Sequence, residues 1–310
     1  MSSLLIEVNN LSRYYGNHCA VDDISFTLEK GEVLGFLGPN GAGKTSTMQM
    51  LCGNLAPSSG QIKINNFDIL DQPQQAKQYL GYLPDTPPLY KELTVNEFLE
   101  YCAKLHKVPF RQVNKAISTS KARCGLNEVS ERLITNLSKG YQQRVGIAQA
   151  ILHAPKVIVL DEPTVGLDPI QIKEIRTLIK ELGSEHGIIL STHILSEVQE
   201  SCSHVQIINQ GKLIFNESID HLNHQLNTST IKVETRSPLN LDHFSHISSI
   251  TSIENEIDTQ YLFHYASNEN PTEQLAEIIV NSGCGLLELS ATKQSLEDIF
   301  IALTTKKNNA

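Results

Sequence analysis

The first two thirds of the chain alternate short apolar runs with amphipathic stretches, and each predicts one element. Consecutive apolar residues predict buried strands, whereas apolar residues three or four apart predict one face of a helix. The run Val157–Leu160 is unbroken and rich in β-branched residues, as expected of a central parallel strand covered on both faces. The predicted strands are Leu4–Val8, Ser25–Leu28, Glu32–Leu37, Ile62–Ile64, Val157–Leu160, Ile188–Leu190, Val205–Ile208 and Leu213–Phe215.

Helical spacing marks the segments between these strands. A helix is predicted over Val95–His106, where Thr94 and Glu97 form a capping-box pattern. A second covers Ser138–His153, with Pro155 just beyond its end. The next helix has an apolar stripe of Ile172, Ile175, Ile179 and Leu182. This alternation of strands and helices predicts an α/β fold in which helices cover both faces of a parallel sheet.

The pattern changes near residue 220. The segment Asp220–Thr230 is polar and rich in Asn and His, which predicts a linker. Strands and helices are then predicted at Ile231–Thr235, near Ile253, and at Tyr261–Tyr265, Thr272–Asn281, Leu286–Leu289 and Ser295–Leu303. The domain prediction is therefore a large domain over 1–219, a linker over 220–230, a small α+β domain over 231–305 and a disordered tail over 306–310.

Composition narrows the class of protein. The 310 residues include 25 basic and 34 acidic side chains, so the net charge is −9, which argues against a general nucleic-acid binder. The N-terminus has neither the basic region nor the apolar core of a signal peptide, and no apolar run approaches the roughly 20 residues of a membrane span. None of the six cysteines forms a C-x-x-C pair, so reduced thiols in a cytosolic protein are expected.

The most informative motif lies between the strand Glu32–Leu37 and a predicted helix over Lys44–Leu51. It reads Gly38-Pro39-Asn40-Gly41-Ala42-Gly43-Lys44-Thr45 and fits the phosphate-binding pattern G-x-x-x-x-G-K-S/T. A glycine-rich turn at a helix N-terminus lets several backbone N–H groups converge on an anion. Lys44 is predicted to reach the β- and γ-phosphates, and the Thr45 hydroxyl to ligate Mg²⁺. The motif therefore predicts nucleotide binding.

Two carboxylates follow the buried strand Val157–Leu160. Asp161 can hold Mg²⁺, directly or through water, and Glu162 can orient or deprotonate an attacking water. The alternative to this catalytic interpretation is that Asp161 and Glu162 are two solvated acids at the end of a strand. The phosphate-binding motif earlier in the chain favours the catalytic interpretation.

A second anion site is predicted at the start of the helix Ser138–His153. Ser138 and Gly140 stand at a helix N-terminus, where the dipole favours an anion. Two phosphate-recognising elements in one chain favour a head-to-tail dimer in which each nucleotide touches both subunits. The alternative is an ordinary surface helix with Ser138 as its N-cap.

The order of these elements resembles the ATPase subunit of ATP-binding cassette (ABC) transporters. The segment Leu137-Ser138-Lys139-Gly140-Tyr141-Gln142-Gln143 is similar to that family's signature, and the resemblance covers residues 1–217. It implies a P-loop NTPase fold of ABC type: a parallel sheet core, an antiparallel β subdomain and a helical subdomain, here followed by a small C-terminal α+β domain.

The resemblance also implies site residues. Tyr15 matches the aromatic residue that stacks on adenine, Asp168 lies in a loop that meets the opposite subunit, and His193 matches the switch histidine that contacts the γ-phosphate. The implied catalytic residues are Lys44, Glu162 and His193. The implied ATP-binding residues are Tyr15, Gly38, Pro39, Asn40, Gly41, Ala42, Gly43, Lys44, Thr45 and Ser46. Those implied to reach ATP across the dimer are Ser138, Gly140, Gln142 and Asp168.

One position departs from the family pattern. Where the family most often has Gln, this chain has Asp85. Its carboxylate could replace the amide as an oxygen ligand near Mg²⁺, or it could point away and only begin the turn at Pro87 and Pro88. The predicted metal site therefore contains Thr45 and Asp161, with Asp85 as a further candidate.

The resemblance implies a function and partners. The segment after Asp85 and the tail Ser295–Phe300 are similar to an exporter branch that includes gliding-motility-type ATPases. The expectation is an ATP-hydrolysing subunit that uses ATP and Mg²⁺, dimerises with itself, and drives a separate integral membrane permease as a peripheral protein on the cytoplasmic face. Nucleic acid is not expected as a partner. The alternatives are a soluble ABC ATPase acting on nucleic acid or ribosomes, a nucleotide-gated regulatory module with little turnover and, more remotely, a P-loop kinase.

Overall fold

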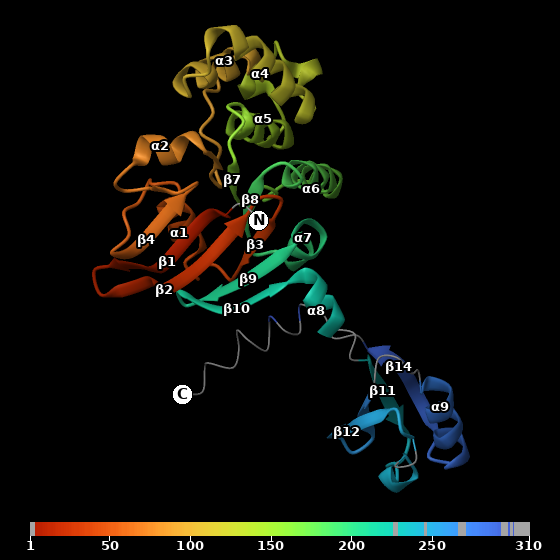
Figure 1. The fold of residues 1–310 in the computed structure, drawn as a ribbon. Helices are drawn as coiled ribbons and strands as arrows, with labels where there is room; N and C mark the ends of the chain where they lie inside the picture. The colour runs from red at the N-terminus through yellow and green to blue at the C-terminus, as the bar shows by residue number, and fades with distance from the viewer. Residues whose placement is uncertain are drawn as a thin grey trace. The chain divides into compact units, whose positions relative to one another are not determined.

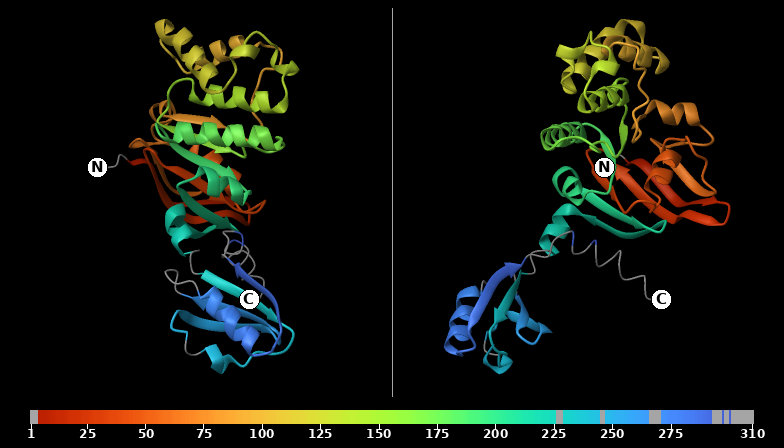
Figure 2. Two further views of the ribbon diagram at one scale, coloured as in Figure 1. Left: turned by 90° about the vertical axis from the view of Figure 1, so that its right-hand side faces the viewer. Right: turned by 180° about the vertical axis from the view of Figure 1, so that it is seen from behind.

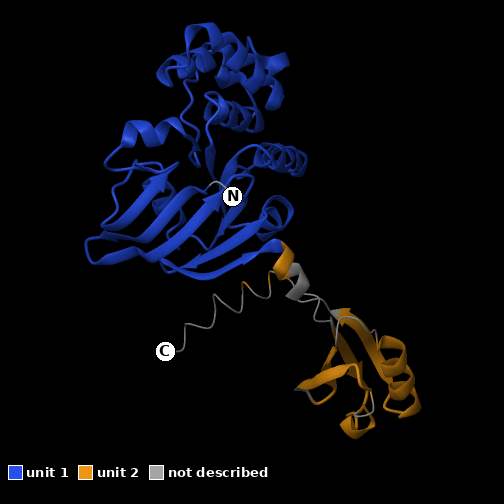
Figure 3. Ribbon diagram, viewed as in Figure 1, with its two compact units in different colours: residues 1–219 blue, residues 220–310 orange. Residues whose placement is uncertain are grey.

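The computed structural model describes residues 4–225, 229–244, 247–265 and 271–292, together with positions 297 and 300. The chain divides into two compact units, residues 1–219 and residues 220–310 (Figure 3). Most of the helix predicted over 295–303 and the tail over 306–310 lie outside the described residues.

A six-stranded sheet forms the centre of the first unit (Figure 1). Five of its strands are parallel, and β10 runs antiparallel to β9 at one edge. In spatial order the strands are β10 (Lys212–Ser218), β9 (His204–Asn209), β3 (Val33–Leu37), β8 (Gly187–Thr192), β7 (Val157–Asp161) and β6 (Leu80–Leu83). Because parallel strands end together, β3, β7 and β8 bring their carboxyl ends to the same edge of the sheet.

The central strands are buried on both faces, as predicted. Along β7, Val157 and Val159 belong to one apolar core, whereas Ile158 and Leu160 belong to the other. The first core includes residues of helix α1 (Lys44–Leu51) and of a second, antiparallel sheet. One face of the parallel sheet is therefore covered largely by strands, which confirms the antiparallel β subdomain implied by the resemblance. The alternation of strands and helices by itself predicted helices on both faces.

The antiparallel sheet has the order β2-β1-β4-β5. Its strands are β1 (Leu4–Tyr15), β2 (His18–Glu29), β4 (Ser59–Ile64) and β5 (Phe67–Asp68). Strand β1 runs well beyond the predicted end at Val8. Its pairing with β2 shifts register between Val8 and Leu11, and Asn10 has a left-handed backbone with φ 49°. This bulge interrupts the apolar alternation, which explains why the pattern predicted a shorter strand.

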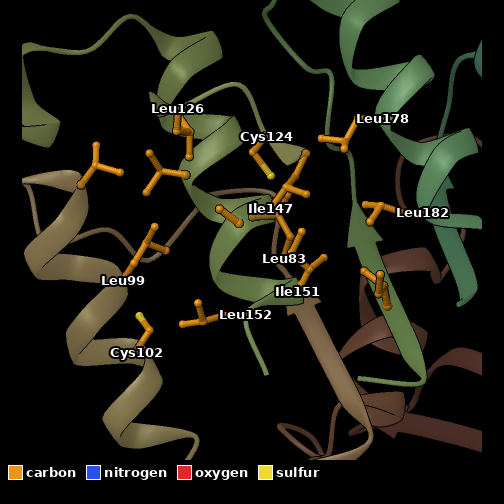
Figure 4. Close-up of a cluster of buried hydrophobic side chains, with 14 of the residues drawn as sticks. Leu83, Leu99, Cys102, Cys124, Leu126, Ile147, Ile151, Leu152, Leu178 and Leu182 are labelled. Atoms are coloured by element: carbon orange, nitrogen blue, oxygen red, sulfur yellow. The ribbon is translucent and has the colours of Figure 1, made fainter. Parts of the chain in front are cut away.

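Helices cover the other face of the parallel sheet and form a subdomain at one end of the unit (Figures 1 and 2). The capping box at Thr94 is confirmed, because its hydroxyl accepts from the Glu97 N–H while the Glu97 carboxylate accepts from the Thr94 N–H. Figure 4 shows apolar side chains of α3, α5 and α6 that surround Leu83 of β6. The helices of this unit after α1 are α2 (Pro73–Gln78), α3 (Val95–Leu105), α4 (Phe110–Arg123), α5 (Lys139–Ile151), α6 (Pro169–Gly183) and α7 (Leu195–Ser201), with 3-10 turns at Asn127–Val129 and Ile134–Asn136.

The second unit is a small α+β fold. Helix α8 (Ile219–Gln225) occupies the first part of the segment predicted to be a linker. An antiparallel sheet follows in the order β12-β13-β11-β14, and its core includes Leu275 and Ile279 of the predicted helix. The elements are β11 (Ser229–Thr235), a 3-10 turn at Leu241–Phe244, β12 (Ile250–Ile257), β13 (Gln260–Tyr265), α9 (Thr272–Asn281) and β14 (Leu286–Thr292).

Candidate nucleotide site

The loop from Gly38 to Gly43 connects the buried strand β3 to the N-terminus of α1. Gly43 has φ 109°, and a Cβ there would lie 2.4 Å from the carbonyl oxygen of Ala20. A Cβ at Gly38 would lie 2.4 Å from the carbonyl oxygen of Ile208. These two positions require glycine for space, and Gly43 requires it for backbone conformation as well. The packing against β2 and β9 therefore fixes the loop at the helix N-terminus, where backbone N–H groups attract an anion.

Lys44 lies across this loop and is only 6% exposed. Its ammonium donates to the carbonyl oxygens of Gly38 at 2.8 Å and Pro39 at 3.3 Å. It also lies 3.6 Å from Oε1 of Glu162. The structure thus brings the lysine of the phosphate motif and the proposed catalytic carboxylate into one ion pair.

Glu162 follows directly after β7 in a left-handed backbone conformation, with φ 50°. Such a conformation costs about 1–3 kcal/mol for a residue other than glycine and occurs mainly where surrounding contacts fix it. Here the Glu162 N–H donates to the Ser191 carbonyl at 2.9 Å, which ties it to the end of β8. The Glu162 carboxylate contacts Nδ1 of His193 at 2.9 Å. Residues predicted from two separate motifs therefore meet in space.

Asp161 is the last residue of β7 and is 1% exposed. Neither carboxylate oxygen has a hydrogen-bond partner in the structure. Desolvation raises the pKa of this carboxyl; the nearby Ser191 hydroxyl and Lys44 oppose the shift, whereas the charges of Glu162 and Asp85 add to it. An unsatisfied buried carboxylate beside Lys44 fits a site for a cation, because a hard divalent ion such as Mg²⁺ prefers oxygen ligands.

Lys44, Glu162 and His193 line a pocket of about 500 Å³. The other predicted residues Gly38, Pro39, Ala42 and Asp161 are not part of its lining. The predicted residues that line the pocket come from the end of β1, the phosphate loop, the start of α1, the segment after β6, the residue after β7 and the loop after β8. The full lining is Tyr15, His18, Ala20, Asn40, Gly41, Gly43, Lys44, Thr45, Ser46, Asp85, Glu162, Val165 and His193. Exposed Asp85 belongs to this lining, so the structure places it at the pocket rather than away from it.

Tyr15 forms one wall of the pocket and is 44% exposed. Its hydroxyl lies 3.4 Å from Oγ of Ser46, and the guanidinium of Arg13 lies 4.7 Å from its ring centroid. His18, Val165 and Arg13 were not predicted. His18 and Val165 have no local sequence signal, because the pairing of β1 with β2 and the turn after Glu162 bring them to the pocket. Arg13 lies two residues before Tyr15 on β1 and contacts the Tyr15 ring rather than the pocket.

The residues predicted to act across a dimer do not line this pocket. Ser138 is exposed, and its hydroxyl accepts from the Tyr141 N–H as the N-cap of α5. Asp168 is the N-cap of α6 and accepts from the Ile170 and Gln171 N–H groups. The Gln142 amide donates inward to carbonyl oxygens, and Gly140 is buried against Gln171. Within one chain, each of these four residues therefore contacts its own surroundings and not the nucleotide pocket.

Within the part of the chain that the structure describes, none of the helices combines the length and the apolar character that a membrane span requires.

Comparisons with known proteins agree with this geometry. The family model described as ABC transporter matches residues 21–165. The bacitracin transport ATP-binding protein BcrA of Bacillus licheniformis is 34% identical over 313 residues, which cover 97% of each chain. The linearmycin resistance ATP-binding protein LnrL of Bacillus subtilis is 32% identical and covers 97% of this chain and 98% of its own length.

A solved structure of an ATP-binding subunit of an ABC transporter superposes with a TM-score of 0.65 at 31% sequence identity, over 71% of this chain and 92% of that one. The fold, the phosphate loop and the similarity along nearly the whole length lead to one conclusion. The chain belongs to the ATP-binding, ATP-hydrolysing subunits of ABC transporters.

Proposed function

We propose that this chain powers an exporter: two copies close on Mg²⁺-ATP and drive a separate integral membrane permease from the cytoplasmic face of the membrane. In this proposal residues 1–219 are the nucleotide-binding domain, 220–230 the connection, 231–305 an accessory domain and 306–310 a tail. Support for export comes from relatives named for bacitracin transport and linearmycin resistance.

One observation carries this proposal: at the pocket, Glu162 contacts both Lys44 and His193, and it directly follows the unsatisfied Asp161. Lys44 would exchange its loop carbonyl contacts for phosphate oxygens. Glu162 would accept the proton of the attacking water, and His193 would contact the γ-phosphate. Asp161, Thr45 and Asp85 would hold Mg²⁺, which when bound neutralises charge on the β- and γ-phosphates.

The positions of the remaining motif residues support the proposed dimer. Ser138, at the N-terminus of α5, and Asp168, at the N-terminus of α6, are both exposed and away from the pocket of their own chain. A helix N-terminus that presents a hydroxyl favours an anion. In the proposed dimer, Ser138, Gly140, Gln142 and Asp168 of one copy complete the ATP site of the other.

The permease contact is proposed for the segment Asp85–Leu93. Tyr90 is 51% exposed and packs edge-on against Tyr101, which is 40% exposed, with ring centroids 5.4 Å apart. Exposed aromatic rings that touch each other are typical of protein contact sites. Because Asp85 lines the nucleotide pocket and Tyr90 lies five residues later, this segment can connect the site to the partner.

Copurification from membranes tests the partner. We expect the affinity-tagged wild-type chain, extracted in mild detergent, to retain one integral membrane protein with several apolar spans. The double variant Tyr90→Ala/Tyr101→Ala should lose it while keeping ATPase activity, and Leu133→Ala, at an exposed position of the same subdomain, should retain it. Recovery of ribosomal or nucleic-acid-binding partners in place of an integral protein would contradict the proposal.

A further inference from the structure

Glu197 is a buried carboxylate that no motif predicted. It lies in the first turn of α7, four residues after His193, and is 1% exposed. An ionised carboxylate at this depth is unfavourable unless donors satisfy it. The groups that donate to this carboxylate therefore indicate its structural role.

Three separate elements supply its partners. The Thr192 hydroxyl, at the end of β8, donates to Oε2 at 2.7 Å. The Thr164 hydroxyl, in the segment after β7, donates to Oε1. Arg176 of α6 places a guanidinium nitrogen 4.0 Å from Oε1. Both threonines are also buried, so the carboxylate joins the segment after β7, the end of β8 and α6.

The Thr192 hydroxyl has a second role. It accepts a hydrogen bond from the Ile194 N–H at 3.1 Å, across the intervening His193. Because its proton goes to Glu197, its lone pairs remain free to accept from this N–H group. The carboxylate thus fixes the orientation of the hydroxyl that shapes the turn carrying His193.

Thr164 supports the turn that carries Glu162, as Thr192 supports the turn that carries His193. It lies two residues after Glu162, within a turn in which the Val165 N–H donates to the Glu162 carbonyl at 3.3 Å and the Leu167 N–H donates to the Thr164 carbonyl at 3.2 Å. Glu162 itself has the left-handed φ of 50°, which surrounding contacts must hold. The hydrogen bond from Thr164 to Glu197 therefore restrains the turn that carries Glu162.

We propose that Glu197 is a positioning residue for ATP hydrolysis, which holds the Glu162 and His193 loops in register through Thr164 and Thr192. The inference rests on the proposed roles of Glu162 and His193, whose side chains meet at 2.9 Å on the pocket side of the same two loops. A misplacement of about 1 Å in such a site can cost about 100-fold in rate. Glu197 itself touches no nucleotide in this account.

The test measures kcat, KM for ATP, ATP affinity and thermal midpoint for a set of matched variants. Thr192→Val, Thr164→Val and Glu197→Gln each remove one part of the network with little change in volume, and Thr192→Ser restores the hydroxyl. Glu200→Gln is the control, because Glu200 is exposed on the same helix and pairs with Arg176 at 3.0 Å but lies outside the threonine contacts. Glu162→Gln is measured beside them.

The expected result is a fall in kcat of about 10- to 100-fold for Thr192→Val, Thr164→Val and Glu197→Gln, with unchanged ATP affinity. The thermal midpoint should fall as well, because each change leaves a buried polar group without a partner, so kcat is compared at a temperature where every variant is folded. Thr192→Ser and Glu200→Gln should hydrolyse ATP at close to the wild-type rate. If Thr192→Val and Glu197→Gln keep the wild-type kcat while Glu162→Gln is inactive, the inference about Glu197 is wrong and the proposed role of Glu162 stands. A fully active Glu162→Gln would overturn the proposed role of Glu162, and this inference with it.

Discussion

At the scale of single residues, Asp85 is where this chain departs from its family's most frequent residue. Its carboxylate lines the pocket and adds to the raised pKa of Asp161, so the two acids are electrostatically close. Two neighbouring carboxylates repel each other unless a cation lies between them. This arrangement favours a role of Asp85 near the metal over that of a simple turn residue.

A titration of Mg²⁺ at fixed ATP tests Asp85. We expect Asp85→Gln to keep ATPase activity, because the amide oxygen also suits Mg²⁺. Asp85→Ala should need on the order of tenfold more Mg²⁺ for half-maximal activity, as expected when one charge-assisted contact of about 1.5–3 kcal/mol is lost. Glu92→Ala, in the same segment, serves as the control. Superimposable Mg²⁺ curves for all these proteins would exclude Asp85 from the metal site.

Asp161 connects function to stability through its raised pKa. Because the folded-state pKa lies above the unfolded value, the ionised carboxylate destabilises the fold, and that penalty grows as pH rises through the folded-state pKa. In nucleotide-free and Mg²⁺-free protein, Asp161→Asn should therefore melt at a higher temperature than wild type at neutral pH. The difference should shrink as pH falls toward the unfolded pKa of about 3.9.

Differential scanning fluorimetry from pH 4 to pH 8 measures this effect. The same variant should lose ATPase activity, since it lacks the anionic oxygen proposed to hold Mg²⁺. Asp71→Asn, at an exposed position, provides the comparison. An Asp161→Asn midpoint below that of wild type at neutral pH would show that the carboxylate is satisfied in the folded protein after all.

At the scale of elements, local signals predicted well wherever one motif carries the information. The capping box at Thr94 and the all-buried strand β7 are confirmed in the structure. Elements without such a signal were not predicted. Helix α4 has a mostly polar sequence, in which only Val113, Ile117 and Ser120 are buried. Helices α2 and α7 are each shorter than two helical turns, so neither shows a clear apolar periodicity.

The capping box also yields a prediction about stability. Thr94→Ala removes the acceptor for the Glu97 N–H and should lower the free energy of unfolding by about 1 kcal/mol. Urea denaturation followed by circular dichroism measures it. Thr119→Ala, exposed within α4, should change the free energy of unfolding by less than about 0.5 kcal/mol. Equal effects of the two substitutions would mean that the cap contributes nothing specific.

At the scale of the whole molecule, the sequence predicted which chemical groups meet but not how they are held. The phosphate loop was recognisable from its pattern of glycine, lysine and threonine after a buried strand, and Asp161 and Glu162 from their place at the end of another. The contact of His193 with Glu162 depends on β7 and β8 being adjacent, and the wall formed by His18 depends on strand pairing in another sheet. Glu197 carried no signal at all, since its partners Thr164, Arg176 and Thr192 belong to three different elements and only the fold brings them together.

The two units give a prediction about truncation. All motif residues lie within residues 1–219, and this unit has its own cores. A fragment of residues 1–225, which retains α8, should fold cooperatively and bind ATP with an affinity within about twofold of the full chain. Isothermal titration with Mg²⁺-ATP and thermal melting measure both properties. A folded fragment with no ATP binding would show that the second unit completes the site.

The central claim is that two copies of this chain close on ATP and that Glu162 then hydrolyses it. Light scattering coupled to size exclusion tests it with Glu162→Gln, because the amide keeps the shape of Glu162 but cannot take up a proton. With Mg²⁺-ATP the mass should double from the 34.4 kDa of one chain, and without ATP, or with Ser138→Arg added, it should stay at one chain. A Glu162→Gln protein that remains monomeric at saturating Mg²⁺-ATP, or that hydrolyses ATP at the wild-type rate, would contradict the account.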